Sequence, residues 1–289
     1  LALGNVAPRR AGVLGVVSGG VAFLAMMAWM RVFGILAWVL VGAYLAAYVG
    51  LFAVLYQWIR ARRAPALGLW AAPVVWTALE YLRSVGVFGF PWGLLGLTQY
   101  AYPPVLQGAR FTGVFGVSFM LALASSTIAT LVAPAASGTT TLRRFLPAVL
   151  PGALVGVTLG WGVVTARAPL AGMSFPVAAV QPNVSARTKF DPLRASDHMQ
   201  TLRRLVVRAG ERGAELIVLP ETAIPFDLFG RQGVLREVGG WATRARATLI
   251  ATSLEGGRSN IAVAVSPSGQ AISRYDKVRL VAFGEYGLT

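Results

Sequence analysis

Glu221 is the first residue whose position in this sequence suggests chemistry. It directly follows Pro220, which ends a run of four apolar, strand-type residues in the stretch ELIVLPETAIPF, residues 215–226. In open α/β sheets, ligands gather at the carboxyl ends of the strands. With Leu219, Pro220 and Ile224 around it, the carboxylate is expected to be partly desolvated and to act as a general base. A cap on the loop after the strand is the competing, structural role.

Lys277 is the second candidate, because lysine is rare in this chain. Of the 26 basic residues, only Lys189 and Lys277 are lysines. A lysine presents a compact charge that can lie against a developing oxyanion, whereas arginine is planar and bulky. Lys277 ends the expected strand AISRYDK, so it meets Glu221 at one rim of the sheet if the two strands are neighbours with the same polarity. The alternative is a surface lysine beside Asp276.

Glu285 is a third candidate, whereas the single histidine and the lack of cysteine argue against metal and thiol sites within these residues. Glu285 lies in VRLVAFGEYG, where a second carboxylate could orient the lysine or a substrate amine, or could be an exposed loop acid. His198 has no second imidazole in the chain, so we assign it a structural role and predict neither a metal site nor a cofactor. The sequence contains no cysteine, which excludes disulfides, thiolate metal sites and a cysteine nucleophile within these residues.

Residues 170–289 form the polar domain that is expected to position these groups. Hydrophobic periodicity predicts a strand, an amphipathic helix, a second strand and a second helix, in the order FPVAAVQPN, ASDHMQTLRRLVVRAGERG, ELIVLPE and GVLREVGGWATRARA. Three further strands follow, TLIATSLE, NIAVAVSP and AISRYDK, and the turn sequence SPSG joins the last two as a hairpin. This order predicts a layered α/β domain with a mixed sheet.

Residues 1–169 have the composition of a membrane domain. The whole chain is 56% hydrophobic and 13% charged, with a mean hydropathy of +0.63, and Glu80 is the one acidic residue in this part. A membrane-spanning helix needs about 20 apolar residues. Five stretches meet that length, at approximately 12–30, 36–58, 66–83, 105–133 and 145–165. The net charge of +15 comes largely from arginine clusters between apolar runs, which is a pattern of membrane topology rather than of nucleic-acid binding.

The distribution of arginine predicts the orientation of the spans. If they cross in turn, one side receives seven arginines, Arg9, Arg10, Arg60, Arg62, Arg63, Arg143 and Arg144. The other side receives four, Arg31, Arg83, Arg110 and Arg167. The first side is therefore expected to be cytoplasmic, and the polar domain is expected to lie outside the cytoplasm.

An outer loop, residues 84–104, is expected between the third and fourth spans. Its sequence, SVGVFGFPWGLLGLTQYAYPP, is too rich in glycine, proline and aromatic residues for a helix. Its candidates for lipid contact are Phe88, Phe90, Pro91 and Trp92, which could equally form an interfacial aromatic belt. Glu80 and Arg83 are expected to form an ion pair at the end of the preceding helix, although an ionisable residue in a span is also a site candidate.

Together these motifs resemble one known family. LPETAIPF at 219–226 and SNIAVAVSPSGQAISRYDKVRLVAFGEYG at 259–287 are similar to the nitrilase-type domain of bacterial apolipoprotein N-acyltransferases. WTALEYLRSVGVFGFPWGLLGLTQY at 76–100 resembles that family's outer loop and the helix before it. The resemblance spans nearly the whole chain. It implies an αββα sandwich following a multi-span α-helical membrane domain in the bacterial inner membrane, with the sandwich on the periplasmic side.

The resemblance also implies residue roles in a Glu-Lys-Cys triad. Glu221 would be the general base, Lys277 would stabilise the tetrahedral oxyanion and Glu285 would support the nucleophile's surroundings. Phe190, in SARTKFDP, would contact substrate. The expected reaction moves an acyl chain from a phospholipid to the α-amino group of a lipoprotein's diacylglyceryl-cysteine by a ping-pong route, carried out by a monomer.

The missing cysteine sets this sequence apart from the family's pattern. We interpret the sequence as a piece of a longer chain, with about two spans ahead of it and one behind, and with the nucleophile and the rest of the sandwich beyond Thr289. This piece alone is expected to be inactive. Ala282 replaces the family's usual proline, and the final GLT also departs from the family's pattern. Two alternatives remain: a membrane-anchored nitrilase-type amidase that uses water as acceptor, and a non-catalytic binding protein of the same fold.

Overall fold

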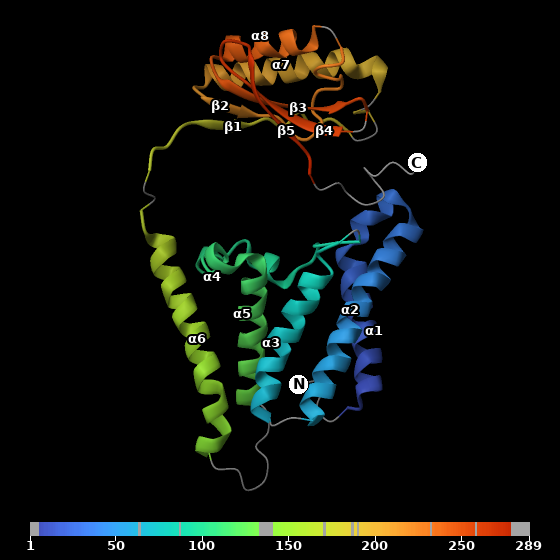
Figure 1. Ribbon diagram of the computed structural model, residues 1–289, viewed down its shortest axis with the longest axis vertical. Coiled ribbons are helices and arrows are strands. Elements are labelled where there is room, and N and C mark those ends of the chain that lie inside the picture. Colours follow the sequence, from blue (N-terminus) through green and yellow to red (C-terminus); the bar gives the residue numbers. More distant parts are fainter. Residues whose placement is uncertain are drawn as a thin grey trace. The chain divides into compact units, whose positions relative to one another are not determined.

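The chain divides into two compact units, Leu1–Leu170 and Ala171–Thr289. The computed structural model describes residues 6–62, 65–86, 88–132, 141–169, 172–185, 188–189, 191–231, 233–257 and 259–278. Unit 1 is helical and unit 2 is a sheet with helices (Figure 1).

Unit 1 is built mainly from long helices (Figure 1). Its elements are α1 (Pro8–Met26), η1 (Ala28–Phe33), α2 (Ile35–Arg62), α3 (Pro65–Leu82), η2 (Leu95–Gln99), α4 (Pro103–Leu106), α5 (Ala109–Val132) and α6 (Thr141–Arg167). An extended loop separates α3 from α5. Within the described residues, α1, α2, α5 and α6 are the helices long and apolar enough to cross a membrane. The fifth expected span, 66–83, corresponds to α3. It is not among those four helices of the described residues, and its 18 residues include Glu80 and an internal proline, Pro73.

Helices α1 and α2 pack closely through glycines. A Cβ atom on Gly15 would lie 2.7 Å from the carbonyl oxygen of Val49, and one on Gly19 would lie 2.8 Å from the Val49 side chain. Small residues allow two helix backbones to approach in this way where lipid offers no hydrophobic drive for association. The outward surfaces of these helices are apolar and exposed, with Val13 at 64% and Val21 at 70%. This is the surface expected of a helix that faces lipid.

Unit 2 contains one five-stranded mixed sheet. Its elements are β1 (Val177–Ala179), η3 (Pro192–Arg194), α7 (Ala195–Glu211), β2 (Leu216–Val218), α8 (Val234–Ala245), β3 (Thr248–Glu255), β4 (Ser259–Val265) and β5 (Ala271–Asp276). The strand order is β1-β2-β3-β4-β5. Strands β1, β2 and β3 are parallel, whereas β4 is antiparallel to both β3 and β5. The expected hairpin at SPSG joins β4 to β5.

The core of unit 2 lies between the sheet and its two helices. Helices α7 and α8 cover the same face of the sheet (Figure 1). Alternate strand residues such as Ile217, Leu249 and Val263 are fully buried there, against Val206 of α7 and Trp241 of α8. The opposite face is more open, and every residue of β5 is exposed. The described residues thus supply one sheet and one helix layer, which is half of the expected αββα sandwich.

Strand polarity brings the carboxyl ends of β1, β2, β3 and β5 to one rim of this sheet. Because β4 is antiparallel to both of its neighbours, β5 runs in the same direction as β2 and β3. The expected common polarity of the strands before Glu221 and Lys277 is therefore observed. The condition that they be neighbours is not met, since β3 and β4 lie between them.

Candidate functional site

Glu221 and Lys277 meet at the carboxyl rim of the sheet. The Lys277 ammonium Nζ donates a hydrogen bond to the Glu221 carboxylate Oε1 at 2.7 Å. The Lys277 side chain is 27% exposed and that of Glu221 is 62% exposed. The expectation of a desolvated Glu221 is therefore wrong for the structure as described, because Glu221 lies in the turn beyond β2 and not within the packed strand.

A crossing turn explains how two strands that are not neighbours bring these side chains together. Residues 219–224 run along the end of β3, where Leu219 N donates to Ile250 O at 3.0 Å and Ile224 N donates to Thr252 O at 2.9 Å. The Thr252 hydroxyl donates to Pro220 O and accepts from Ala223 N. Thr252 thus holds the turn from both sides of Glu221, and the chain carries Glu221 from β2 towards β4 and β5.

Asn260 links this turn to Lys277. Its side-chain Oδ1 accepts from the hydroxyl of Thr222 at 2.7 Å, and its main-chain oxygen accepts from Lys277 N at 2.9 Å. Thr222 is buried and has a φ of +51°, in the left-handed region that residues other than glycine rarely adopt. Sequence reasoning missed both residues. The available signal was an asparagine at the start of a strand, where this residue type is depleted.

Lys189 contacts the main chain of Glu221. Its ammonium Nζ donates to the Glu221 main-chain oxygen at 2.8 Å. Burial lowers the pKa of Lys189, and the negative charge of Glu221 acts in the opposite direction. A pocket of about 140 Å³ lies beside them, and its lining includes Gln181, Asn183, Lys189, His198, Pro220 and Glu221. His198, for which we predicted a structural role, is therefore part of the site's surroundings.

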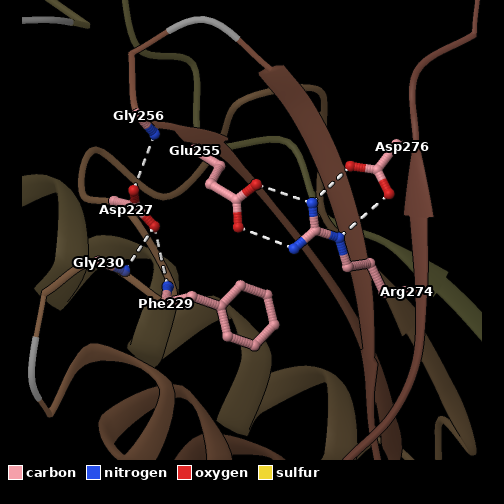
Figure 2. A network of polar contacts seen from close by, with 7 residues as sticks. All are labelled: Asp227, Phe229, Gly230, Glu255, Gly256, Arg274 and Asp276. Atoms are coloured by element: carbon pink, nitrogen blue, oxygen red, sulfur yellow. Dashed lines mark hydrogen bonds and ion pairs between the residues drawn. The ribbon is translucent and has the colours of Figure 1, made fainter.

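Arg274 ties β3 to the end of β5, next to Lys277 (Figure 2). Its guanidinium forms two hydrogen bonds of 2.7 Å with the carboxylate of Glu255 and bonds of 2.6 and 3.1 Å with Asp276. The hydrogen bonds from Asp276 and Glu255 raise the pKa of Arg274, and the Arg274 guanidinium lowers the pKa of Asp276. Because Asp276 directly precedes Lys277, this network fixes the strand end that presents the ammonium.

Asp227 holds the neighbouring loop in place (Figure 2). Its carboxylate accepts main-chain hydrogen bonds from Gly256 at 2.8 Å, Gly230 at 2.8 Å and Phe229 at 2.9 Å. These bonds lower the pKa of Asp227. The ring of Phe229 also lies under the Arg274 guanidinium, 5.5 Å from the centre of the ring. The loop after Glu221 is therefore joined to the β3–β4 turn and to Arg274.

In unit 1, the buried pair Glu80 and Arg83 organises the aromatic loop. The Arg83 guanidinium donates to the main-chain oxygens of Phe90, Trp92 and Gly93 at 3.1, 2.8 and 3.1 Å. Glu80 Oε1 accepts from Leu95 N at 2.7 Å and lies 3.7 Å from Arg83. The side chains of both charged residues are only 3% exposed. The expected ion pair is present, and it also anchors the loop.

The four lipid-contact candidates differ in their surroundings. Phe88, Pro91 and Trp92 are exposed, whereas Phe90 is half-buried. The Trp92 ring packs on Trp29 of η1, with 5.1 Å between ring centres, and lies 6.3 Å from the ring of Phe90. The loop and η1 therefore form one aromatic surface in unit 1.

Two site predictions lie outside the described residues, namely Glu285 and Phe190. In the part of the chain that the structure describes, no group of three or more His, Cys, Asp or Glu side chains could hold a metal ion.

Comparisons with known proteins agree across both units. Residues 1–127 match the profile of the apolipoprotein N-acyltransferase N-terminal domain, and residues 176–288 match that of the carbon-nitrogen hydrolases. An apolipoprotein N-acyltransferase of Geobacter metallireducens is 33% identical over 99% of this chain and 58% of its own length. One from Chromobacterium violaceum is 31% identical over 96% of this chain and 55% of its own length. The chain thus spans little more than half the length of these curated relatives.

Proposed function

Because the chain belongs to the apolipoprotein N-acyltransferase family, we propose that it is part of an enzyme that transfers an acyl chain from a phospholipid to the N-terminal diacylglyceryl-cysteine of a lipoprotein. The observation that carries the proposal is the 2.7 Å contact between Lys277 Nζ and Glu221 Oε1 at the carboxyl rim of a carbon-nitrogen hydrolase sheet. Acyl transfer through a thiol needs a group that takes and returns a proton and a donor that stabilises the oxyanion, and Glu221 and Lys277 are residues of these two types.

In the first half-reaction, Glu221 takes the proton of a cysteine thiol. Glu221 Oε1 accepts from Lys277, so Oε2 receives the proton. The thiolate attacks the ester carbonyl of the phospholipid, and the Lys277 ammonium stabilises the tetrahedral oxyanion. The intermediate collapses when the C–O bond breaks. Glu221 returns the proton to the departing oxygen, which leaves a thioester on the enzyme and a free lysophospholipid.

In the second half-reaction, the α-amino group of the lipoprotein attacks the thioester. Glu221 takes the proton that the amine loses, and Lys277 again stabilises the oxyanion. The C–S bond breaks, the thiolate leaves, and Glu221 protonates it, so the enzyme returns to its starting state. One carboxylate therefore serves both half-reactions.

The nucleophile must come from outside these 289 residues, because they contain no cysteine. We propose that it lies further along the same protein and that Glu285 and Phe190 complete the site. The 289 residues alone form no acyl-enzyme on this account. A phospholipid-to-peptide assay on them is expected to show no turnover above that of Glu221→Ala.

The chain is a membrane protein, and we propose that the membrane is the bacterial inner membrane with unit 2 on its periplasmic side. The arginine asymmetry between alternate helix ends supports this orientation. We further propose that the aromatic surface formed by η1 and residues 88–92 contacts the acyl donor. Its exposed Trp29, Phe88 and Trp92 match the preference of aromatic side chains for the membrane interface.

A matched pair of variants tests the reaction. The complete gene product that contains this chain would be assayed for transfer of a labelled acyl chain from phospholipid to a diacylglyceryl-cysteine peptide. Glu221→Gln is expected to lower kcat/KM by roughly 10²–10⁴. Glu211→Gln, at an exposed acid of α7, is expected to leave it unchanged. Hydrolysis of an amide by water without acyl transfer would instead identify an amidase.

A further inference from the structure

Both lysines of this arginine-rich chain contact the same residue. Lys277 Nζ donates to the carboxylate of Glu221 at 2.7 Å, and Lys189 Nζ donates to its main-chain oxygen at 2.8 Å. The two lysines lie on either side of Glu221 in the sequence, at separations of 56 and 32 residues. One ammonium group therefore binds the side-chain carboxylate of Glu221, and the other binds its main-chain oxygen.

The turn that carries Glu221 depends on such fixed contacts. Thr222 adopts a φ of +51°, a conformation that costs energy for a residue with a Cβ atom and persists only where the surroundings impose it. On the Thr222 side, Asn260 supplies the contact by accepting from the threonine hydroxyl. On the Glu221 side, Lys189 supplies it by donating to the main-chain oxygen. The two contacts together fix the peptide that follows Glu221.

The surroundings of Lys189 favour a small cation. Its side chain lines the pocket of about 140 Å³, together with the carboxylate-bearing Glu221, the imidazole of His198 and the apolar Leu202. The pKa of Lys189 is lowered by burial and held up by Glu221. The compact ammonium group of a lysine can donate to the Glu221 main-chain oxygen at this position, whereas a guanidinium is larger and planar. This is consistent with a lysine at this position in a chain whose other basic residues, apart from Lys277, are arginines.

We infer that Lys189 is a positioning residue for Glu221, which fixes the main chain of the turn so that the carboxylate stays against Lys277. The role of Glu221 as the base rests on the proposed function. The contact between Lys189 and Glu221 is a property of the chain itself and can be tested without turnover. Loss of Lys189 is expected to release the turn and to change the environment of Lys277.

The two lysines make a spectroscopic test simple. In the complete gene product, labelled with ¹³C at lysine Cε and held in lipid nanodiscs, Lys189→Arg and Lys277→Arg assign the resonances of these two lysines. In Lys189→Met, the Lys277 resonance is expected to move towards that of a solvated lysine. Arg204→Met removes one positive charge from an exposed position of α7 and is expected to leave the Lys277 resonance in place. An unchanged Lys277 resonance in Lys189→Met would overturn the inference.

A titration provides a second test if Lys189→Met does not fold. Glu221→Gln keeps the main-chain oxygen and removes the carboxylate charge. The titration midpoint of Lys189 is then expected to fall by roughly 0.5 pH or more, because an adjacent anion has been lost. A midpoint that stays the same would show that Lys189 does not lie against Glu221. Neither result depends on acyl transfer, so failure of the proposed reaction and failure of this inference are distinguishable.

Discussion

Replacing Arg83 with methionine should strongly destabilise unit 1. The guanidinium donates three hydrogen bonds to the loop carbonyls of Phe90, Trp92 and Gly93, and its side chain is 3% exposed beside Glu80. Removing one partner of a buried, hydrogen-bonded ion pair costs about 3–5 kcal/mol. We therefore expect Arg83→Met to lower the free energy of unfolding by that amount, because it leaves three carbonyls without their donor and the buried Glu80 carboxylate without its ionic partner.

The assay compares unfolding curves in mixed micelles for five proteins. These are the wild type, Arg83→Met, Glu80→Gln, the double variant Glu80→Gln/Arg83→Met, and Arg31→Met as a control at an exposed arginine of η1. The control is expected to change stability by no more than about 0.5 kcal/mol. The double variant should lose less than the sum of the single variants, with a coupling of roughly 1–3 kcal/mol. If Arg83→Met unfolds like Arg31→Met, the anchoring role of the pair is wrong.

Three further predictions concern unit 2 and the aromatic loop. Asn260→Ala leaves the buried Thr222 hydroxyl without its acceptor and should lower the free energy of unfolding by about 1–3 kcal/mol. Thermal unfolding would be compared with that of Ser268→Ala, in the exposed β4–β5 turn. Equal midpoints in the two variants would contradict the role of Asn260. The pKa of Asp227 is lowered in the folded state, so the stabilisation by its carboxylate is present above the unfolded pKa and is lost as pH falls through the folded pKa. The melting temperatures of wild type and Asp227→Asn should therefore converge in acid. A difference in melting temperature that does not change with pH would refute this. Trp92→Phe should reduce the quenching of tryptophan fluorescence by brominated lipid, while Trp241→Phe, at a residue buried in unit 2, should not; equal losses would argue against lipid contact by the loop.

Local patterns in the sequence predicted most of the elements of unit 2. The amphipathic helices α7 and α8 follow from periodic apolar residues such as Leu202 and Val238, which the structure buries against the sheet. Strand polarity was also predictable, because strands joined through helices tend to be parallel and the SPSG turn forms a hairpin. The order of the strands depends on long-range pairing, so the sequence left open whether the strands before Glu221 and Lys277 are neighbours, and in the structure they are not.

The site was predictable only in part for a similar reason. Glu221 and Lys277 could be found because each follows a strand in a distinctive composition. Lys189, Thr222 and Asn260 act on a left-handed turn through contacts between residues 32 and 38 positions apart, and local sequence patterns do not predict which residues such contacts join. The exposure of Glu221 also could not be predicted, because it depends on the path of the turn across β3.

Formation of the acyl-enzyme isolates the roles proposed for Glu221 and Lys277. The complete gene product would be mixed with labelled phospholipid and no acceptor, and the burst of released lysophospholipid would be followed in wild type and Lys277→Met. We expect a burst of about one equivalent in the wild type and a rate lower by roughly 10²–10³ in the variant, the loss typical of a missing oxyanion donor. A burst of equal rate in both proteins would contradict the role of the Glu221–Lys277 pair in acyl transfer.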